Sequence, residues 1–190
     1  MTSANAQSRP LTQYLVASSI DGFIADEHDN LDWLLQLDGG PGSEDDVNPY
    51  DEFIKDVGPM AMGATTYEWI QRHYPDEWMY DDRPTWVFTH RELSPIEGAN
   101  LNFTSGDVAA VHAAMVAAAD GKNIWLVGGG ELVGQFMDHD LLDEIWLSLA
   151  PVTLGRGAPL LPRRRTEPMK LMSMRPARDG TFAHLRYSLR

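Results

Sequence analysis

Cysteine is absent from this 190-residue sequence. Disulfides, thiolate metal sites and a cysteine nucleophile are therefore excluded, and the chain suits a reducing cytoplasm. Long apolar runs are missing too, because the longest mainly apolar stretch, residues 108–119, is mostly alanine and is interrupted by His112. Residues 1–10 are polar and lack the apolar core of a signal peptide. We expect a flexible N-terminal tail at 1–10, a single domain at 11–190, a cytoplasmic location and no membrane contact.

Positive charge is also scarce, with 15 lysines and arginines against 28 aspartates and glutamates and a formal net charge of −13. Binding to nucleic acid needs a basic face, so no nucleic-acid partner is expected. A bound phosphate would need positive charge concentrated locally, and the candidates are His90-Arg91 and Arg163-Arg164-Arg165, which are otherwise solvated loop charges. None of the six histidines has a partner at the spacing of zinc ligands, so we expect no metal.

The most informative stretch, residues 123–137, reads Asn-Ile-Trp-Leu-Val-Gly-Gly-Gly-Glu-Leu-Val-Gly-Gln-Phe-Met. Its first half is a short apolar run typical of a buried strand, and its second half spaces apolar residues as a helix does. The glycines at 128–130 let a ligand approach the main chain, and the free N–H groups of a helix start favour an anion. The stretch is thus either a phosphate-binding turn or a tight strand-to-helix turn without a ligand. It does not match the dinucleotide fingerprint, which needs glycine in place of Val133, and a P-loop is also absent.

Strand-like and helix-like segments alternate through residue 150. The pattern predicts strands at 11–19, 23–25, 60–63, 85–89, 98–103, 124–127, 144–150, 169–174 and 183–189, and helices at 50–57, from 64 onward, from 105 or 106 to 119, and after 130. Residues 26–46 read as a long loop, either a functional lid or a surface excursion held by Trp33. The fold class is therefore α/β, with helices on both faces of a mostly parallel sheet and a C-terminal antiparallel hairpin.

Three of the predicted strands end in residues suited to ligand binding, namely Gly63, Thr89 and Gly128. Ligands of open α/β sheets bind beyond the carboxyl ends of the strands, so these positions favour the ligand-binding interpretation of the glycine turn. After Gly63, Thr65 or Thr66 is placed either to cap a helix or to offer its hydroxyl to a phosphate.

Four motifs in order resemble the dihydrofolate-reductase-like superfamily, and within it the branch of riboflavin-biosynthesis reductase (RibD C-terminal) domains. They are Ser19 to Ala25 with Asp32-Trp33-Leu34, Met62 to Glu68, Val127 to Leu132, and Pro151 to Leu160. The similarity runs from about Leu11 to Leu189. It implies a three-layer fold with an eight-stranded, mainly parallel sheet, and NADPH laid across the strand ends.

The resemblance also implies which residues hold the cofactor. Beside the nicotinamide we expect Ala17, Ile24 and Ala25, and at the phosphates near one helix start we expect Gly63, Thr65 and Thr66. The residues expected on the pyrophosphate and nicotinamide side are Val127, Gly128, Gly129, Gly130, Glu131, Leu132 and Val133. Thr89, His90 and Arg91 would approach the adenosine ribose and its 2′-phosphate. Preference for NADPH over NADH rests on His90 and Arg91, because Ala64 stands where many dihydrofolate reductases have a basic residue.

The substrate side has weaker signals. Dihydrofolate reductases bind the pteridine with one carboxylate on the helix after the first loop, and here that helix offers Asp51, Glu52 and Asp56 without a unique alignment. We select Asp51 as the catalytic acid, with a solvated helix charge as the alternative. Trp33 and Ser148 are the candidate substrate contacts.

The expected function is that of an NADPH-dependent reductase acting on a small heterocyclic or imine-like substrate. Dihydrofolate reduction is a second possibility. A non-catalytic nucleotide-binding or assembly module with the same fold is the third, favoured by the lack of an unambiguous acid and by Glu131, whose carboxylate repels a pyrophosphate unless it points away. Members of the family often form homodimers, so a homodimer is expected here.

Overall fold

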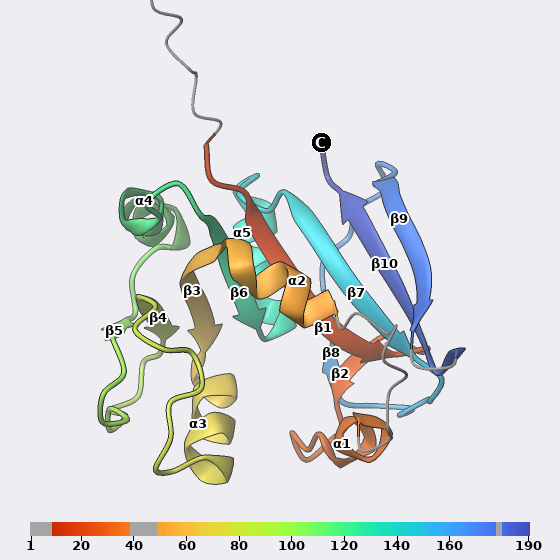
Figure 1. Ribbon diagram of the computed structural model, residues 1–190, viewed down its shortest axis with the longest axis horizontal. Coiled ribbons are helices and arrows are strands. Elements are labelled where there is room, and N and C mark those ends of the chain that lie inside the picture. The colour runs from red at the N-terminus through yellow and green to blue at the C-terminus, as the bar shows by residue number, and fades with distance from the viewer. Residues whose placement is uncertain (1–8, 39–48, 178–179) are drawn as a thin grey trace, which may run out of the picture.

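The computed structural model describes residues 9–38, 49–177 and 180–190. Its main sheet has eight strands in the order β5-β4-β3-β6-β1-β7-β10-β9 (Figure 1). Their bounds are β1 Thr12–Ser19, β3 Val57–Gly63, β4 Thr85–Phe88, β5 Leu101–Thr104, β6 Asn123–Gly128, β7 Glu144–Ala150, β9 Lys170–Ala177 and β10 Phe182–Ser188. The first six strands in this order are parallel, whereas β10 runs antiparallel to both β7 and β9. The predicted mostly parallel sheet with a C-terminal antiparallel hairpin is confirmed.

Helices cover both faces of the sheet, as predicted. On one face, α4 (Val108–Ala118) and α5 (Gly130–Asp138) pack on a core that contains Ala61, Leu126 and Phe136. On the other, α2 (Pro49–Phe53) and α3 (Ala64–His73) pack on Met60, Met62 and Trp125. Neighbouring residues of β3 and β6 thus belong to opposite cores, because side chains alternate along a strand. Both faces are apolar, and this explains why the central strands read as continuous hydrophobic runs.

The segment read as a long loop contains a helix. Residues Asp32–Asp38 form α1, and residues 39–46 of the predicted loop lie outside the described residues. Trp33, Leu34 and Leu37 pack with Ala150 and Phe182 in a small separate core. The helix was missed because it is only seven residues long and lies in a segment rich in Asp, Asn, Gly and Pro, although four of its seven residues are apolar. A second small sheet joins β2 (Phe23–Ala25) to β8 (Ala158–Pro159) beside it.

The N-caps of two helices differ from the prediction. The N-cap of α4 is Asp107, whose carboxylate accepts a hydrogen bond from the Ala110 N–H at 3.3 Å, and not Ser105 or Gly106. The N-cap of α3 is Gly63, and no side chain caps this helix. The hydroxyls of Thr65 and Thr66 therefore do not cap α3, and its first backbone N–H groups lack a side-chain acceptor.

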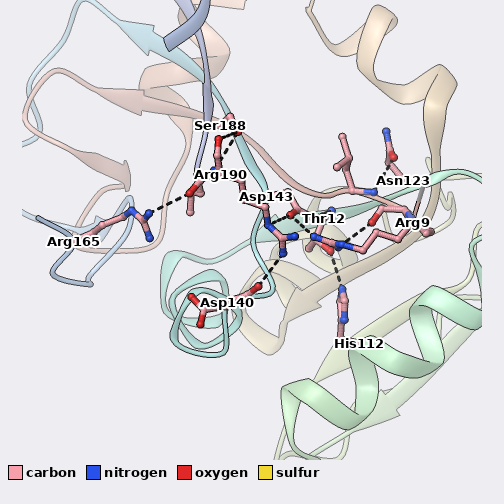
Figure 2. Close-up of polar contacts among 12 residues, drawn as sticks. Arg9, Thr12, His112, Asn123, Asp140, Asp143, Arg165, Ser188 and Arg190 are labelled. Atoms are coloured by element: carbon pink, nitrogen blue, oxygen red, sulfur yellow. Dashed lines mark hydrogen bonds and ion pairs between the residues drawn. The ribbon is translucent and has the colours of Figure 1, made fainter. Parts of the chain in front are cut away.

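The amino-terminal ends of the parallel strands are held together by Asp143, which precedes β7 (Figure 2). Its carboxylate accepts hydrogen bonds from the Thr12 N–H at 2.9 Å and from Arg9 at 2.6 Å, and it pairs with Arg190 at 2.8 Å. The side chain is 2% exposed. Asp143 thus connects the two ends of the described chain at the edge of the sheet opposite Gly63 and Gly128.

None of the described helices has the length and apolar character that crossing a membrane requires.

Candidate functional site

A cavity of about 760 Å³ lies at the carboxyl ends of β1, β3, β4 and β6. Its lining includes residues 15–17 of β1 and the last residues of β3, β4 and β6, and the N-terminal turns of α3 and α5 form part of its wall. Cavities of this size suit a cofactor or small molecule. The position is the one where open α/β sheets bind ligands.

The glycine turn after β6 contributes bare backbone to this cavity. Gly128 has φ 143°, a conformation that favours glycine, and the peptide bond between Gly128 and Gly129 is cis. Gly129 is the N-cap of α5 and has no side-chain cap. At Gly130 a Cβ would stand 2.3 Å from the carbonyl oxygen of Pro159 and 2.5 Å from that of Leu160. Gly130 is therefore needed for close packing of β8 on α5, whereas Gly128 and Gly129 leave the main chain open.

The start of α3 faces the start of α5. A Cβ at Gly63 would lie 3.8 Å from the Gly129 nitrogen, and one at Gly128 would lie 3.6 Å from the Thr66 hydroxyl oxygen. Two helix N-termini, each with free N–H groups and the positive end of the helix dipole, thus meet at one place. This arrangement suits a diphosphate better than either helix does alone.

Arg91 is the one lysine or arginine among the described residues that line the cavity. It follows β4, where the Thr89 hydroxyl accepts a hydrogen bond from the Arg91 N–H at 2.9 Å. Its guanidinium pairs with the carboxylate of Glu68 on α3. His90 lines the same part of the cavity and is exposed. Of the two basic sites considered from the sequence, 90–91 is the one that lines the cavity.

The arginine triplet lies elsewhere. Arg163 holds the Glu131 carboxylate through two hydrogen bonds, at 3.0 and 2.7 Å, and it also contacts Asp138 at 2.7 Å. The bonds from Arg163 lower the pKa of Glu131. Arg165 pairs with Glu167 at 3.3 Å. Glu131 lines the cavity, but Arg163, which it shares with Asp138, partly offsets its charge, so it is a weaker obstacle to a bound anion than its sequence position suggests.

The structure brings together nearly all of the residues predicted to hold the cofactor. Those that line the cavity are Ala17, Ile24, Ala25, Gly63, Thr65, Thr66, Thr89, His90, Arg91, Val127, Gly128, Gly129, Gly130, Glu131 and Leu132. Val133 is the exception, because it points into the core and is fully buried. Its helix turn brings Leu132 to the cavity instead.

The three residues predicted for catalysis and substrate do not line the cavity. Asp51 is exposed on α2. Trp33 packs on Ala150 and Phe182. Ser148 lies in a narrow second pocket of about 20 Å³, where its hydroxyl is 2.8 Å from the His184 Nδ1. The roles given to them remain predictions, and the geometry of the described residues gives them no support.

Sequence reasoning missed an apolar group of lining residues that includes Leu15, Trp69, Ile70 and Tyr80. Trp69 and Ile70 follow Thr66 by three and four residues, and side chains at this spacing share a helix face, so helix geometry alone could have found them. Tyr80 lies in the connection between α3 and β4, and its sequence context carries no such signal. Asp29, before α1, was missed for the same reason.

Residues 64–182 match the family model of the RibD C-terminal domain. The uncharacterized protein YwjB of Bacillus subtilis (strain 168) is 34% identical over 176 residues, which cover 93% of this chain and 96% of that protein. The chain belongs to the RibD C-terminal domain family. A further uncharacterized protein of the same organism, YyaP, is 25% identical and is matched over 76% of this chain and 77% of its own length.

Solved structures agree on the fold of this RibD C-terminal domain. The putative riboflavin biosynthesis protein from Shewanella sp. PV-4 superposes with a TM-score of 0.77 at 24% identity, over 95% of this chain and 99% of that one. The Thermotoga maritima diaminohydroxyphosphoribosylaminopyrimidine deaminase/5-amino-6-(5-phosphoribosylamino)uracil reductase gives 0.63 at 14% identity, over 95% of this chain and 56% of that one. Dihydrofolate reductase from Enterococcus faecalis, complexed with NADP(H) and RAB-propyl, gives 0.58 at 16% identity, over 94% of both chains. The fold is that of the dihydrofolate-reductase-like reductases.

Proposed function

We propose that this chain is an NADPH-dependent reductase that transfers a hydride to a small heterocyclic or imine-like substrate. The observation that carries the proposal is the meeting of two helix N-termini, at Gly63 and Gly129, in a cavity with Arg91 in its wall. A dinucleotide needs an anion site for its diphosphate and room for two further groups on either side of it, and the two helix N-termini and the volume of about 760 Å³ support this assignment.

The described residues fit the cofactor as follows. The first N–H groups of α3 and α5 donate hydrogen bonds to the diphosphate, with the Thr66 hydroxyl beside them. Arg91 and His90 receive the adenosine ribose and its 2′-phosphate. Ala17, Ile24 and Ala25 give the nicotinamide an apolar border that excludes water. When bound, NADPH supplies the hydride, and the protein's task is to orient the two reactants.

Reduction also needs a proton, and two carboxylates compete for that role. Asp51 is the sequence-based candidate, but it does not line the cavity. Asp29 does line it, and none of the ion pairs among the described residues involves its side chain. We propose that Asp29 is the better candidate. Asp29→Asn should then lower kcat more than Asp51→Asn does, with both variants binding NADPH as the wild type does.

Binding of the cofactor is tested by following the melting temperature while NADPH or NADH is titrated. A ligand at 100 times its Kd stabilises the folded state by about 2.7 kcal/mol, which is easily measured. The test variant is Thr66→Val, which removes one hydroxyl from the proposed diphosphate site. It should reduce the shift in melting temperature caused by NADPH. No shift with either cofactor would contradict the proposal.

A non-catalytic nucleotide-binding module is the competing proposal. Two features of the sequence favour it, the lack of an unambiguous acid and the charge of Glu131 beside the glycines. The pairing of Glu131 with Arg163 weakens the second, whereas the position of Asp51 outside the cavity lining leaves the first in place. Cofactor binding without oxidation of NADPH by any member of a panel of heterocycles and imines would favour this alternative. Oxidation of NADPH that depends on one of these compounds would favour the reductase.

We also propose that the chain forms a homodimer. The support is β9, the edge strand of the sheet, which exposes Leu171, Met172 and Met174 and has unpaired backbone groups along one side. Met174 is 69% exposed. Light scattering after size-exclusion chromatography should give a molar mass twice the chain mass of 21.2 kDa. In Met174→Lys the measured mass should decrease toward that of the monomer. A monomer in the wild type would contradict this part of the proposal.

A further inference from the structure

One face of α5 carries two carboxylates, that of Glu131 in its first turn and that of Asp138 in its last. The two residues are seven apart, so they lie on the same side of the helix, about two turns from one another. Gly134 lies between them, and a Cβ there would stand 2.8 Å from the Arg163 Cζ and 2.9 Å from its Cγ. The arginine side chain therefore lies flat against α5, in space that the side chain of any other residue at 134 would fill.

This position gives the guanidinium of Arg163 a fixed hydrogen-bond geometry. Its two terminal nitrogens donate to the two carboxylate oxygens of Glu131 at 3.0 and 2.7 Å, and its Nε donates to Asp138 at 2.7 Å. The Arg163 side chain is 21% exposed, against 66% for Glu131. The main chain before Arg163 is held as well, because Leu160 and Leu161 pack against the core to which α5 contributes. One positioned arginine thus occupies both carboxylate oxygens of Glu131.

The place of Glu131 in the helix makes this pairing matter for a bound anion. α5 has no side-chain cap, and the Val133 N–H donates to the Gly129 carbonyl at 3.2 Å. The N–H groups of residues 130–132 precede this bond and have no partner within the helix, and one of them belongs to Glu131 itself. A carboxylate in the first turn is attracted to the same positive end of the helix. An unpaired Glu131 would therefore compete with an anionic ligand for these donors.

The two arginines that follow Arg163 do not share its position. Among the described residues, Arg164 is exposed and takes part in no ion pair. Arg165 pairs with Glu167 at 3.3 Å and donates to a carbonyl near the C-terminus. Of the three, Arg163 alone pairs with a residue that lines the cavity. Arg164 is thus a control that carries the same charge at the next position in the chain.

We propose that Arg163 is a positioning residue of the anion site. It holds the Glu131 carboxylate away from the free N–H groups of α5 and so keeps these groups available to the diphosphate of the cofactor. The inference rests on the proposed function, which places a dinucleotide in this cavity. Arg163 acts through Glu131 and does not itself line the cavity. Gly134 has a part in the same arrangement, because glycine leaves room for the guanidinium.

The test measures the Kd of NADP⁺ by calorimetry, at low and at high salt. Arg163→Gln should weaken NADP⁺ binding by about threefold or more at low salt, whereas Arg164→Gln should change it by less than about 1.5-fold. The loss in Arg163→Gln should become smaller at high salt, because salt screens the charge of the exposed Glu131 carboxylate. Equal losses in the two arginine variants overturn the inference, since they would reflect net charge alone.

Removing the charge of Glu131 separates this role from a merely structural one. In Glu131→Gln no carboxylate is left for Arg163 to restrain, so adding Arg163→Gln should weaken NADP⁺ binding by less than about 1.5-fold. A loss as large as that of Arg163→Gln in the wild-type background would show that Arg163 acts by another route, and the inference would fail.

Gly134→Ala is an independent variant, because it displaces the guanidinium and leaves its charge in the chain. It should weaken NADP⁺ binding in the wild-type background and have less effect in the Glu131→Gln background. Wild-type affinity in a folded Gly134→Ala protein overturns the inference. Melting temperatures identify the variants that fold, and the arginine variants decide the inference if Gly134→Ala does not.

A second probe, sodium pyrophosphate, separates this inference from the proposed function. It is titrated into the same variants without cofactor. Pyrophosphate binding that depends on Arg163, in a wild type that binds no NADP⁺, would overturn the reductase and leave the role of Arg163 in place. Substrate-dependent oxidation of NADPH, with equal affinities in Arg163→Gln and Arg164→Gln for both probes, would do the reverse. A wild type that binds neither probe overturns both.

Discussion

The carboxylate of Glu68 forms an ion pair with the guanidinium of Arg91. Arg91 is the one lysine or arginine among the described residues that line the cavity. Glu68 is on α3 and Arg91 follows β4, so the pair connects two elements at the wall of the cavity. The Arg91 side chain is 56% exposed and that of Glu68 30%. A bound 2′-phosphate must compete with this carboxylate for the same arginine.

Replacing Glu68 by Gln should therefore raise the preference for NADPH over NADH. Partly exposed ion pairs contribute about 0.2–1 kcal/mol, so we expect a change of roughly 1.5- to 5-fold in the ratio of the two dissociation constants. Arg91→Ala should lower the ratio. Calorimetry at low salt measures the dissociation constants of NADPH and NADH for both variants. Arg156→Ala is the control, because Arg156 pairs with Glu27 and does not line the cavity. An unchanged ratio in Glu68→Gln would contradict this competition.

Two glycines of the site should respond differently to alanine. Gly130→Ala places a Cβ against two backbone carbonyls that cannot rotate away, so we expect a loss of about 3 kcal/mol or more in unfolding free energy. Gly63 has φ −81°, and its nearest neighbours are 3.8 Å away, so Gly63→Ala should change stability by less than about 0.5 kcal/mol. Gly63→Ala should nevertheless weaken NADPH binding by about tenfold, because the added Cβ enters the proposed diphosphate site. Urea unfolding and calorimetry would separate the two effects.

Asp143→Asn should destabilise the end of the sheet opposite the cavity. The amide keeps an acceptor for the Thr12 N–H but loses its charge interaction with Arg9 and Arg190. Both arginines are partly exposed and stay hydrated, so we expect a moderate loss of about 1–3 kcal/mol in unfolding free energy. Urea unfolding at pH 7 measures it, with Glu167→Gln as the control because that residue is 80% exposed. An equal effect of the two variants would contradict the role given to Asp143.

His112 should make stability depend on pH. It is buried on α4, with its Nε2 2.8 Å from the Thr12 hydroxyl, and burial lowers its pKa; nearby Arg9 acts in the same direction and Asp143 opposes it. The unfolded state then binds the proton more tightly than the folded state. The contribution of His112 to the free energy of unfolding is therefore complete above pH 6.5. It decreases as the pH falls from there toward the pKa of His112 in the folded state.

The measurement is urea unfolding of the wild type and His112→Gln at pH 8 and pH 5.5. The wild type should be the more stable at pH 8, and the difference should shrink at pH 5.5, because only the wild type loses stability by protonation at this position. A difference that stays constant with pH would show that His112 does not titrate in this way.

Much of the fold could be predicted because its signals are local. The apolar run before Gly128 and the alternation of residues in β10 follow from the period of a strand, and both strands are found. The helix α1 was not predicted, since its apolar residues are stabilised by contacts with Ala150 and Phe182, which are distant in sequence. The start of α4 was misplaced by one or two residues because Ser105, Gly106 and Asp107 are all plausible caps.

The candidate site divides in the same way. Gly63, Thr89 and Gly128 could be nominated from the sequence because the end of a strand is a local feature, and parallel pairing brings such ends together. By itself the sequence thus determined the fold class, the edge of the sheet that holds the cavity and the overall scarcity of positive charge in the chain. Only the tertiary structure decided that Arg163 pairs with Glu131, that Arg91 is held by Glu68, and that Trp69 and Tyr80 line the cavity while Asp51 does not. These relations join residues far apart in the chain, and the packing of whole elements sets them, which no local pattern records.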